Sequence, residues 1–141
     1  MSLPISRLLP LVGKLNSLVF SVPGVGETLV RTTSRTVGKL AYRLPLLGGV
    51  QAQHVGHLHD QWLRFLGVIG IRSKVVEHSD GQFVLTVDRC PYGFHTDREQ
   101  GVCDACMDLD RAYIGELGGR LEIEERLTEG AHCCRFRISF P

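Results

Sequence analysis

Apolar residues recur at helical spacing in three stretches of the chain, residues 27–44, 50–66 and 103–117. Within each stretch they fall three, four or seven residues apart, which places them on one face of an α-helix. We therefore predict three amphipathic helices, each with one buried stripe. The stripes are Val30, Val37, Ala41 and Leu44; Val55, Leu58, Trp62 and Phe65; and Cys106, Leu109, Tyr113 and Leu117.

Strand signals follow the second and the third helix. Asp80-Gly81 is a strong hairpin signal, because a tight turn between strands needs residues that accept a positive φ. A second hairpin is predicted around Thr128-Glu129-Gly130. The order after residue 49 predicts an α+β fold, in which helices lie on one face of an antiparallel sheet of two hairpins. The four predicted strands are residues 69–76, 82–89, 120–127 and 132–140.

Charge divides the chain into two parts. Residues 1–50 carry six basic residues and one acid, whereas the remainder carries ten basic residues and fourteen acids. We therefore predict a basic, amphipathic helical arm over residues 1–48 and a cysteine-rich α+β domain over residues 49–141. A basic row along the second half of the arm fits anionic lipid, an acidic partner or a helix surface that covers the protein's own core. The row is Arg31, Arg35, Lys39 and Arg43.

The arm is also rich in apolar residues, more than one face of a small domain is expected to bury. We therefore predict that residues 1–48 dock onto a larger protein complex or a second copy of the chain, with peripheral membrane contact as the alternative. A net charge of +1 gives no indication of a nucleic-acid partner. No signal peptide or membrane span is evident, so we expect a cytoplasmic protein, with membrane association left open. The apolar residues are Leu8, Leu9, Leu11, Val12, Leu15, Leu18, Val19 and Phe20.

Five cysteines supply the candidate chemistry. Cys103 and Cys106 are three residues apart at the predicted start of the third helix, so their thiols share one side. Cys90 follows a predicted strand and a last cysteine lies in another, and strand and helix ends can meet at one edge of a sheet. We therefore predict that Cys90, Cys103, Cys106 and Cys134 bind zinc or an iron–sulfur cluster. The helix start is expected to lower the thiol pKa values.

The last ligand is either Cys133 or Cys134. Strand alternation favours Cys134, because it shares a face with Phe136 and Ile138, whereas Cys133 shares a face with Arg135. The simpler interpretation of all these cysteines is that they are small hydrophobic core residues.

Three motifs in the second half of the chain resemble the 2-amino-thiazoline-4-carboxylic acid hydrolase-like family. That family is similar to a vinyl-reductase-like small-ligand-binding domain. The resemblance covers about residues 50–140 and implies the α+β fold and the same four cysteine positions. Its most specific part is Gly130, Cys134 and Phe136, and Ala131 departs from the acid usual after that glycine. The motifs are Arg89-Cys-Pro-Tyr, Val102-Cys-Asp-Ala-Cys and Leu127-Thr-Glu-Gly-Ala-His-Cys-Cys-Arg-Phe-Arg-Ile.

These features support two functional hypotheses. In the first, the chain is an auxiliary or sensor subunit, with a cysteine-bound metal or cluster beside a small-ligand pocket and with the arm docking it to a complex or membrane. In the second, it is a small hydrolase. A thiolate of Cys103 or Cys106 would attack a cyclic or acyl substrate, with His95 or His132 as the base. Whether the chain is an enzyme at all stays open at this point.

Overall fold

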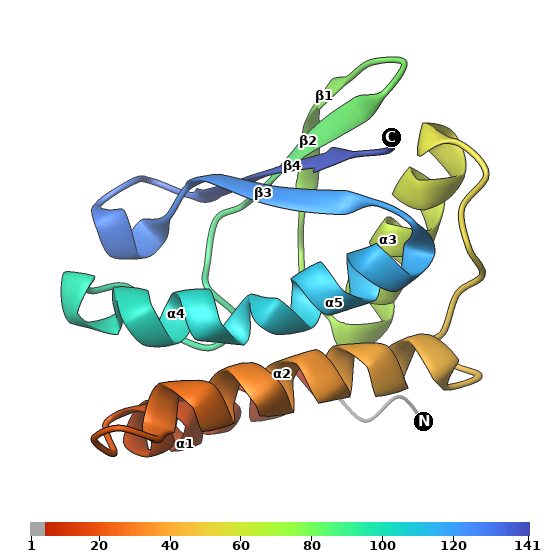
Figure 1. The fold of residues 1–141 in the computed structure, drawn as a ribbon. Coiled ribbons are helices and arrows are strands. Elements are labelled where there is room, and N and C mark those ends of the chain that lie inside the picture. Colours follow the sequence, from red (N-terminus) through yellow and green to blue (C-terminus); the bar gives the residue numbers. More distant parts are fainter. Residues whose placement is uncertain (1–4) are drawn as a thin grey trace.

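The computed structural model describes residues 5–141 and has the α+β fold predicted from the sequence (Figure 1). Two short 3-10 helices, Asp97–Glu99 and Leu127–Glu129, lie before α4 and β4. The helices are α1 (Ile5–Phe20), α2 (Gly26–Arg43), α3 (Val55–Ile69), α4 (Gln100–Cys106) and α5 (Asp108–Leu117), and the strands are β1 (Lys74–His78), β2 (Gln82–Val87), β3 (Arg120–Glu125) and β4 (Cys134–Ser139).

The sheet consists of the two predicted hairpins laid side by side. Its strand order is β1-β2-β4-β3, and all neighbouring strands are antiparallel. Leu85 of β2 lies opposite Phe136 of β4, and both point toward the helices. The other face carries charge, where Arg135 pairs with Glu77 and Glu124. One apolar and one charged face give the sheet a single buried side, and the helices cover it.

The helices form two layers on that side. In Figure 1, α4 and α5 run end to end beneath the sheet, and α2 runs beneath them, paired with α1. The layers approach closely at Gly38 of α2, where a Cβ atom would lie 2.4 Å from the carbonyl oxygen of Leu109. Only glycine permits this separation of backbones, so Gly38 sets how near α2 lies to α5.

Ion pairs join the same two layers. Arg31 lies 2.9 Å from Asp104, and Arg35 lies 2.9 Å from Asp108. Arg111 pairs with both acids from within α5. Burial alone would raise the pKa of Asp104, but hydrogen bonds from the surrounding guanidinium groups outweigh it and hold that pKa below its ordinary value. Half of the basic row on α2 therefore faces the chain's own acids.

Some helix positions differ from the sequence prediction. The third helix was expected to start at residue 103, but helical structure begins at Asp97, and the helix is divided at Met107. Val37 and Leu44 were expected in the buried stripe of α2 and are exposed, because the closely packed part of α2 is the line through Val30 and Ala41. Over residues 5–141, no helix has the length and apolar character needed to cross a membrane.

Candidate functional site

A partly enclosed cavity of about 210 Å³ lies between the sheet and the helices. Side chains from the sheet and from both helix layers form its wall. From α3 come Trp62, Phe65, Leu66 and Ile69, whose spacing of three, four and seven residues is that of one helix face. Alternate residues of the strands complete the apolar wall, among them Leu85 and Val87 of β2 and Phe136 of β4. Ala41 of α2 and Met107 at the α4–α5 junction close the opposite side.

Two oxygen-bearing side chains interrupt this apolar wall. Asp110, a half-buried residue of α5, lies three residues before Tyr113 and seven before Leu117, on the stripe that carries these two buried side chains, and it lines the cavity. Tyr92, in the loop after β2, also lines it. Within residues 5–141, the Asp110 carboxyl is hydrogen-bonded only by its own backbone N–H, and the Tyr92 hydroxyl has no hydrogen-bond partner.

Burial dominates the protonation of both groups. It raises the pKa of Asp110 to about 7, because the ionised carboxylate loses its hydration, and nearby Arg111 offsets only part of this. Burial also raises the pKa of Tyr92 well above its ordinary value, and the charge of Asp110 adds to the effect. The carboxyl therefore changes charge near neutral pH, whereas the phenol stays neutral.

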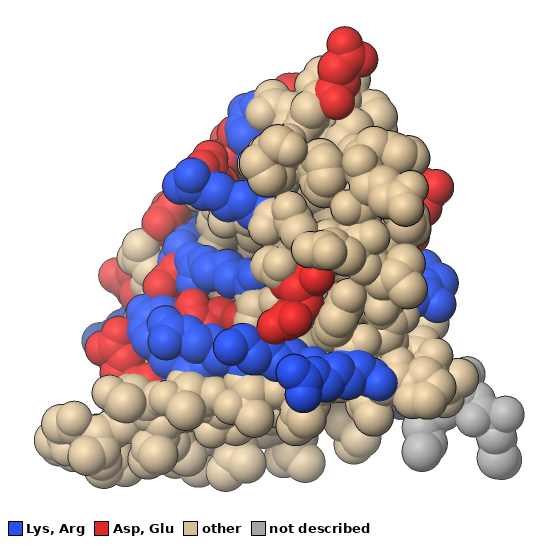
Figure 2. Space-filling view, turned by 45° about the vertical axis from the view of Figure 1, so that its right-hand side comes forward, with Lys and Arg blue, Asp and Glu red and all other residues tan. Residues whose placement is uncertain are grey.

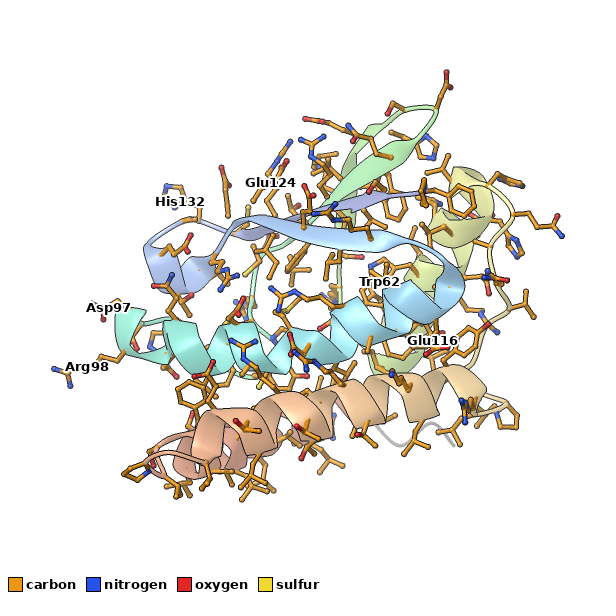
Figure 3. All side chains as sticks on the ribbon, viewed as in Figure 1. Trp62, Asp97, Arg98, Glu116, Glu124 and His132 are labelled. Atoms are coloured by element: carbon orange, nitrogen blue, oxygen red, sulfur yellow. The ribbon has the colours of Figure 1, made fainter. Side chains whose placement is uncertain are left out.

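Trp62 also lines the cavity, and within residues 5–141 its indole N–H is buried without a hydrogen-bond partner. Trp62 is buried between α3 and the rest of the core (Figure 3), and its Nε1 atom has no hydrogen-bond partner among the described residues. Buried donors normally find a partner, because an unmatched one loses its hydrogen bonds to water. The cavity thus holds polar groups that the protein itself leaves unpaired.

The cysteines lie around one part of this cavity. Cys90, Cys103 and Cys134 line it, and Cys106 is buried in the small cluster next to it. Burial raises the pKa of Cys103 to about 12 and that of Cys106 to about 11. The pKa values of Cys90 and Cys134 are raised for the same reason. The expected lowering by the helix start is not seen, because burial dominates the pKa values of Cys103 and Cys106, which lie three and six residues after the helix start at Gln100.

A metal or iron–sulfur centre at these cysteines is not supported, and that prediction is wrong. Across residues 5–141, no three His, Cys, Asp or Glu side chains are grouped so that they could hold a metal ion. The thiols instead accept weak hydrogen bonds, Cys106 from Asn16 at 3.3 Å and Cys134 from the Leu127 N–H at 3.5 Å. The predicted auxiliary or sensor subunit built on a zinc or iron–sulfur centre is wrong for the same reason, since that function depends on the centre.

The two candidate bases lie apart from the cavity wall. His95 is exposed, and its Nδ1 lies 3.0 Å from the carbonyl oxygen of Gly93. His132 is exposed and projects outward from the turn before β4 (Figure 3). Thiols with raised pKa values are weak nucleophiles near neutral pH. The catalytic role of Cys103, Cys106, His95 and His132 stays a prediction that this geometry does not favour.

Asp110 and Trp62 were not predicted as site residues. The signal for Asp110 was present, because an acid three and seven residues before two apolar stripe positions is out of place on a buried helix face. Trp62 was correctly assigned to the core, but its unpaired N–H depends on side-chain orientation, which the sequence pattern does not contain.

Comparison with known proteins adds a similarity of structure. No family model and no curated protein matches the chain, so the resemblance to the hydrolase-like family stays a prediction. Among solved structures, one similar chain is trafficking protein particle complex subunit 3 from Naegleria fowleri, crystallised covalently bound to palmitic acid. The TM-score is 0.41 and the identity 12%, and the similarity covers 97% of this chain and 78% of the other. A similarity of this size does not extend to function.

Proposed function

We propose that this protein binds a small, largely apolar ligand in the cavity between its sheet and its helices. The observation that carries the proposal is the cavity itself, about 210 Å³ within a wall of apolar side chains. Protein interiors are packed almost as densely as organic crystals, and voids larger than a water molecule are rare. A partly enclosed, largely apolar volume of this size therefore fits a ligand better than it fits ordinary packing.

The energetic argument points the same way. Cavities left in protein cores cost about 24 cal/mol per Å³, which for this volume is about 5 kcal/mol. That is a large part of the free energy of unfolding of a typical domain. Away from Asp110 and Tyr92 the wall is apolar, and apolar cavities of comparable size accept benzene or xenon. An apolar ligand would recover this free energy, so binding and stability should rise together.

Ala41 provides a direct test, because its small side chain lines the cavity from α2. In the unmodified protein, naphthalene or benzene is expected to raise the midpoint of thermal unfolding. Ala41→Leu should place three more carbon atoms into the cavity, weaken naphthalene binding by at least about tenfold and raise the midpoint without ligand. Calorimetric titration and thermal unfolding measure the two effects.

Thr33→Leu is the matched control, since it introduces the same side chain at an exposed position of the same helix. It should leave naphthalene binding unchanged. The proposal fails if neither probe stabilises the unmodified protein, or if Ala41→Leu binds naphthalene as tightly as Thr33→Leu does.

We also propose that the outer surface of α1 and α2 is covered by a second copy of this chain. Leu11, Leu15 and Leu18 lie on one face of α1 and are 66%, 59% and 69% exposed. Figure 2 shows the base of the molecule, where α1 and α2 lie, as a broad surface with few charges. Contiguous apolar surfaces of this kind mark interaction sites. A second copy presents an equally apolar face, and the two would bury each other without needing opposite charges.

Anionic lipid fits this surface less well. Arg31 and Arg35, which could have met lipid head groups, are paired with Asp104 and Asp108. The predicted docking of residues 1–48 onto a larger complex or a membrane stays a proposal, and so does the predicted cytoplasmic location. Measuring the oligomeric state tests the second-copy proposal against the membrane alternative.

Light scattering during size-exclusion chromatography should show a dimer, and Leu11→Glu with Leu15→Glu should convert it to a monomer. Val68→Glu, an exposed apolar position on α3, is the control and should stay dimeric. A monomer at every concentration contradicts the proposal. If that monomer floats with vesicles of phosphatidylglycerol, the surface is a membrane contact instead.

A further inference from the structure

Asp110 is the one carboxyl group in the wall of the cavity, within the part of the chain that the structure describes. It stands where the periodicity of α5 calls for an apolar residue, in line with Tyr113 and Leu117. A carboxyl group at such a position is costly unless a partner compensates it, because burial removes its hydration. No neighbouring side chain hydrogen-bonds to it among residues 5–141, so the compensation must come from elsewhere.

The adjacent arginine does not provide that compensation. The Arg111 guanidinium lies 2.8 Å from Asp104 and 2.8 Å from Asp108 and makes no hydrogen bond to Asp110, so its charge offsets the burial of Asp110 only in part. The charge of Asp110 also raises the pKa values of the Tyr92 phenol and the Cys106 thiol, and both of these groups are acids. The cavity wall contains no Lys, Arg or His among the described residues. Its polar part is therefore complementary to a cation and not to an anion.

We propose that Asp110, with Tyr92 beside it, holds the amine head of an amphipathic ligand whose hydrocarbon body fills the cavity. This inference rests on the proposed ligand-binding function and specifies its ligand class. A primary ammonium group offers three N–H donors, which the carboxylate and the Tyr92 hydroxyl oxygen can accept. A carboxylate head could accept a hydrogen bond from the Tyr92 hydroxyl, but it would meet the charge of Asp110 in a site of low dielectric constant.

The binding of an amine should depend on pH in a defined direction. An alkylamine stays protonated below about pH 10, so Asp110 is the group that changes charge near neutrality, with its pKa raised to about 7 by burial. Affinity for the amine should therefore increase as the pH rises from about 6 to about 8. Affinity for an uncharged ligand of equal length should not increase over this interval.

The experiment compares hexylamine, 1-hexanol and hexanoate in calorimetric titrations of the full chain at about pH 8. Hexylamine is expected to bind at least about tenfold more tightly than hexanoate. Asp110→Asn should weaken hexylamine binding by at least about tenfold, change 1-hexanol binding by less than about threefold, and remove the pH dependence. Tyr92→Phe should weaken hexylamine binding by a smaller factor.

Asp97→Asn is the control, because it makes the same change in net charge at an exposed residue that is not part of the cavity wall and that lies before the outer end of α4 (Figure 3). It should bind all three compounds like the unmodified protein. If hexanoate or 1-hexanol binds as tightly as hexylamine, the amine specificity is refuted while the ligand-binding function stands. If none of the three binds, the ligand-binding function itself is refuted. Retained 1-hexanol binding by Asp110→Asn shows that this variant is folded.

Discussion

Asp110 has a consequence for stability as well as for binding. Its pKa is about 7 in the folded protein and near 3.8 when exposed, so the folded state binds the proton more tightly. A raised folded pKa gives stability that is present at low pH and lost as the pH rises through the folded value. The free energy of unfolding contributed by this residue should therefore decrease between about pH 4 and about pH 7.

Replacing Asp110 by asparagine should remove this dependence. Asparagine has nearly the shape of the protonated carboxyl but carries no charge to bury. At about pH 8 we expect Asp110→Asn to be more stable than the unmodified protein by a few kcal/mol, and at about pH 3, below both pKa values of Asp110, the two should be nearly equal. Urea unfolding at the two pH values measures the difference. An equal effect at both pH values would rule out the titration of Asp110 as its cause.

The cysteines show why residue chemistry was hard to predict. Their spacing correctly indicated a shared neighbourhood, since three of them line one cavity and the fourth lies beside it. Ligation also requires side chains that point at one position and can lose their protons. Neither property follows from spacing alone, and the burial that brings these thiols together also keeps them protonated.

At the scale of single elements, the contact of α2 with α5 depends on a glycine. Gly38→Ala would place a Cβ atom 2.4 Å from the Leu109 carbonyl oxygen, so the two helices would have to separate. We expect a loss of about 1–3 kcal/mol in the free energy of unfolding, the usual cost of overpacking. The gain of alanine over glycine in helix propensity, about 1 kcal/mol, offsets only part of that loss.

Gly115 on α5 is the matched position, because nothing lies within 4 Å of a Cβ atom added there. Gly115→Ala should stabilise the protein by about 0.5–1 kcal/mol through propensity alone. Denaturant unfolding of both variants should therefore give effects of opposite sign. Stabilisation by both would mean that the helices separate freely at Gly38.

The elements themselves were largely predictable. The Asp80-Gly81 turn correctly identified the first hairpin, and the helical stripes identified α2, α3 and α5. The start of the third helix was missed because residues 97–100 are polar and carry no apolar stripe. The cavity could not be predicted, because its volume depends on the distances and angles between elements, which periodicity does not specify.

For the whole molecule, the boundary predicted between residues 48 and 49 stays a prediction. Three residues of α2 contact the rest of the protein across this boundary. Val30 and Ala41 are buried against it, and Arg31 pairs with Asp104. We therefore expect that a chain of residues 49–141 unfolds without a cooperative transition. A chain of residues 21–141, which keeps α2, should retain one.

Circular dichroism during urea unfolding distinguishes these cases. A sharp transition for residues 49–141, with a helix and strand content like that of the full chain, would instead support an independent domain. Residues 21–141 control for the loss of α1, which supplies Ile5 and Leu9 to the cavity wall and the Asn16 hydrogen bond to Cys106.

The position of β4 in the sheet has a consequence for synthesis of the protein. β4 follows every other strand in the chain, yet it lies between β2 and β3 and pairs with both. Until the ribosome has added residues 134–139, β2 and β3 have no strand between them, and each presents an unpaired edge. Such edges attract other chains. A nascent chain arrested before residue 134 is therefore expected to be bound by chaperones or to aggregate, and the sheet can close only once β4 has been made.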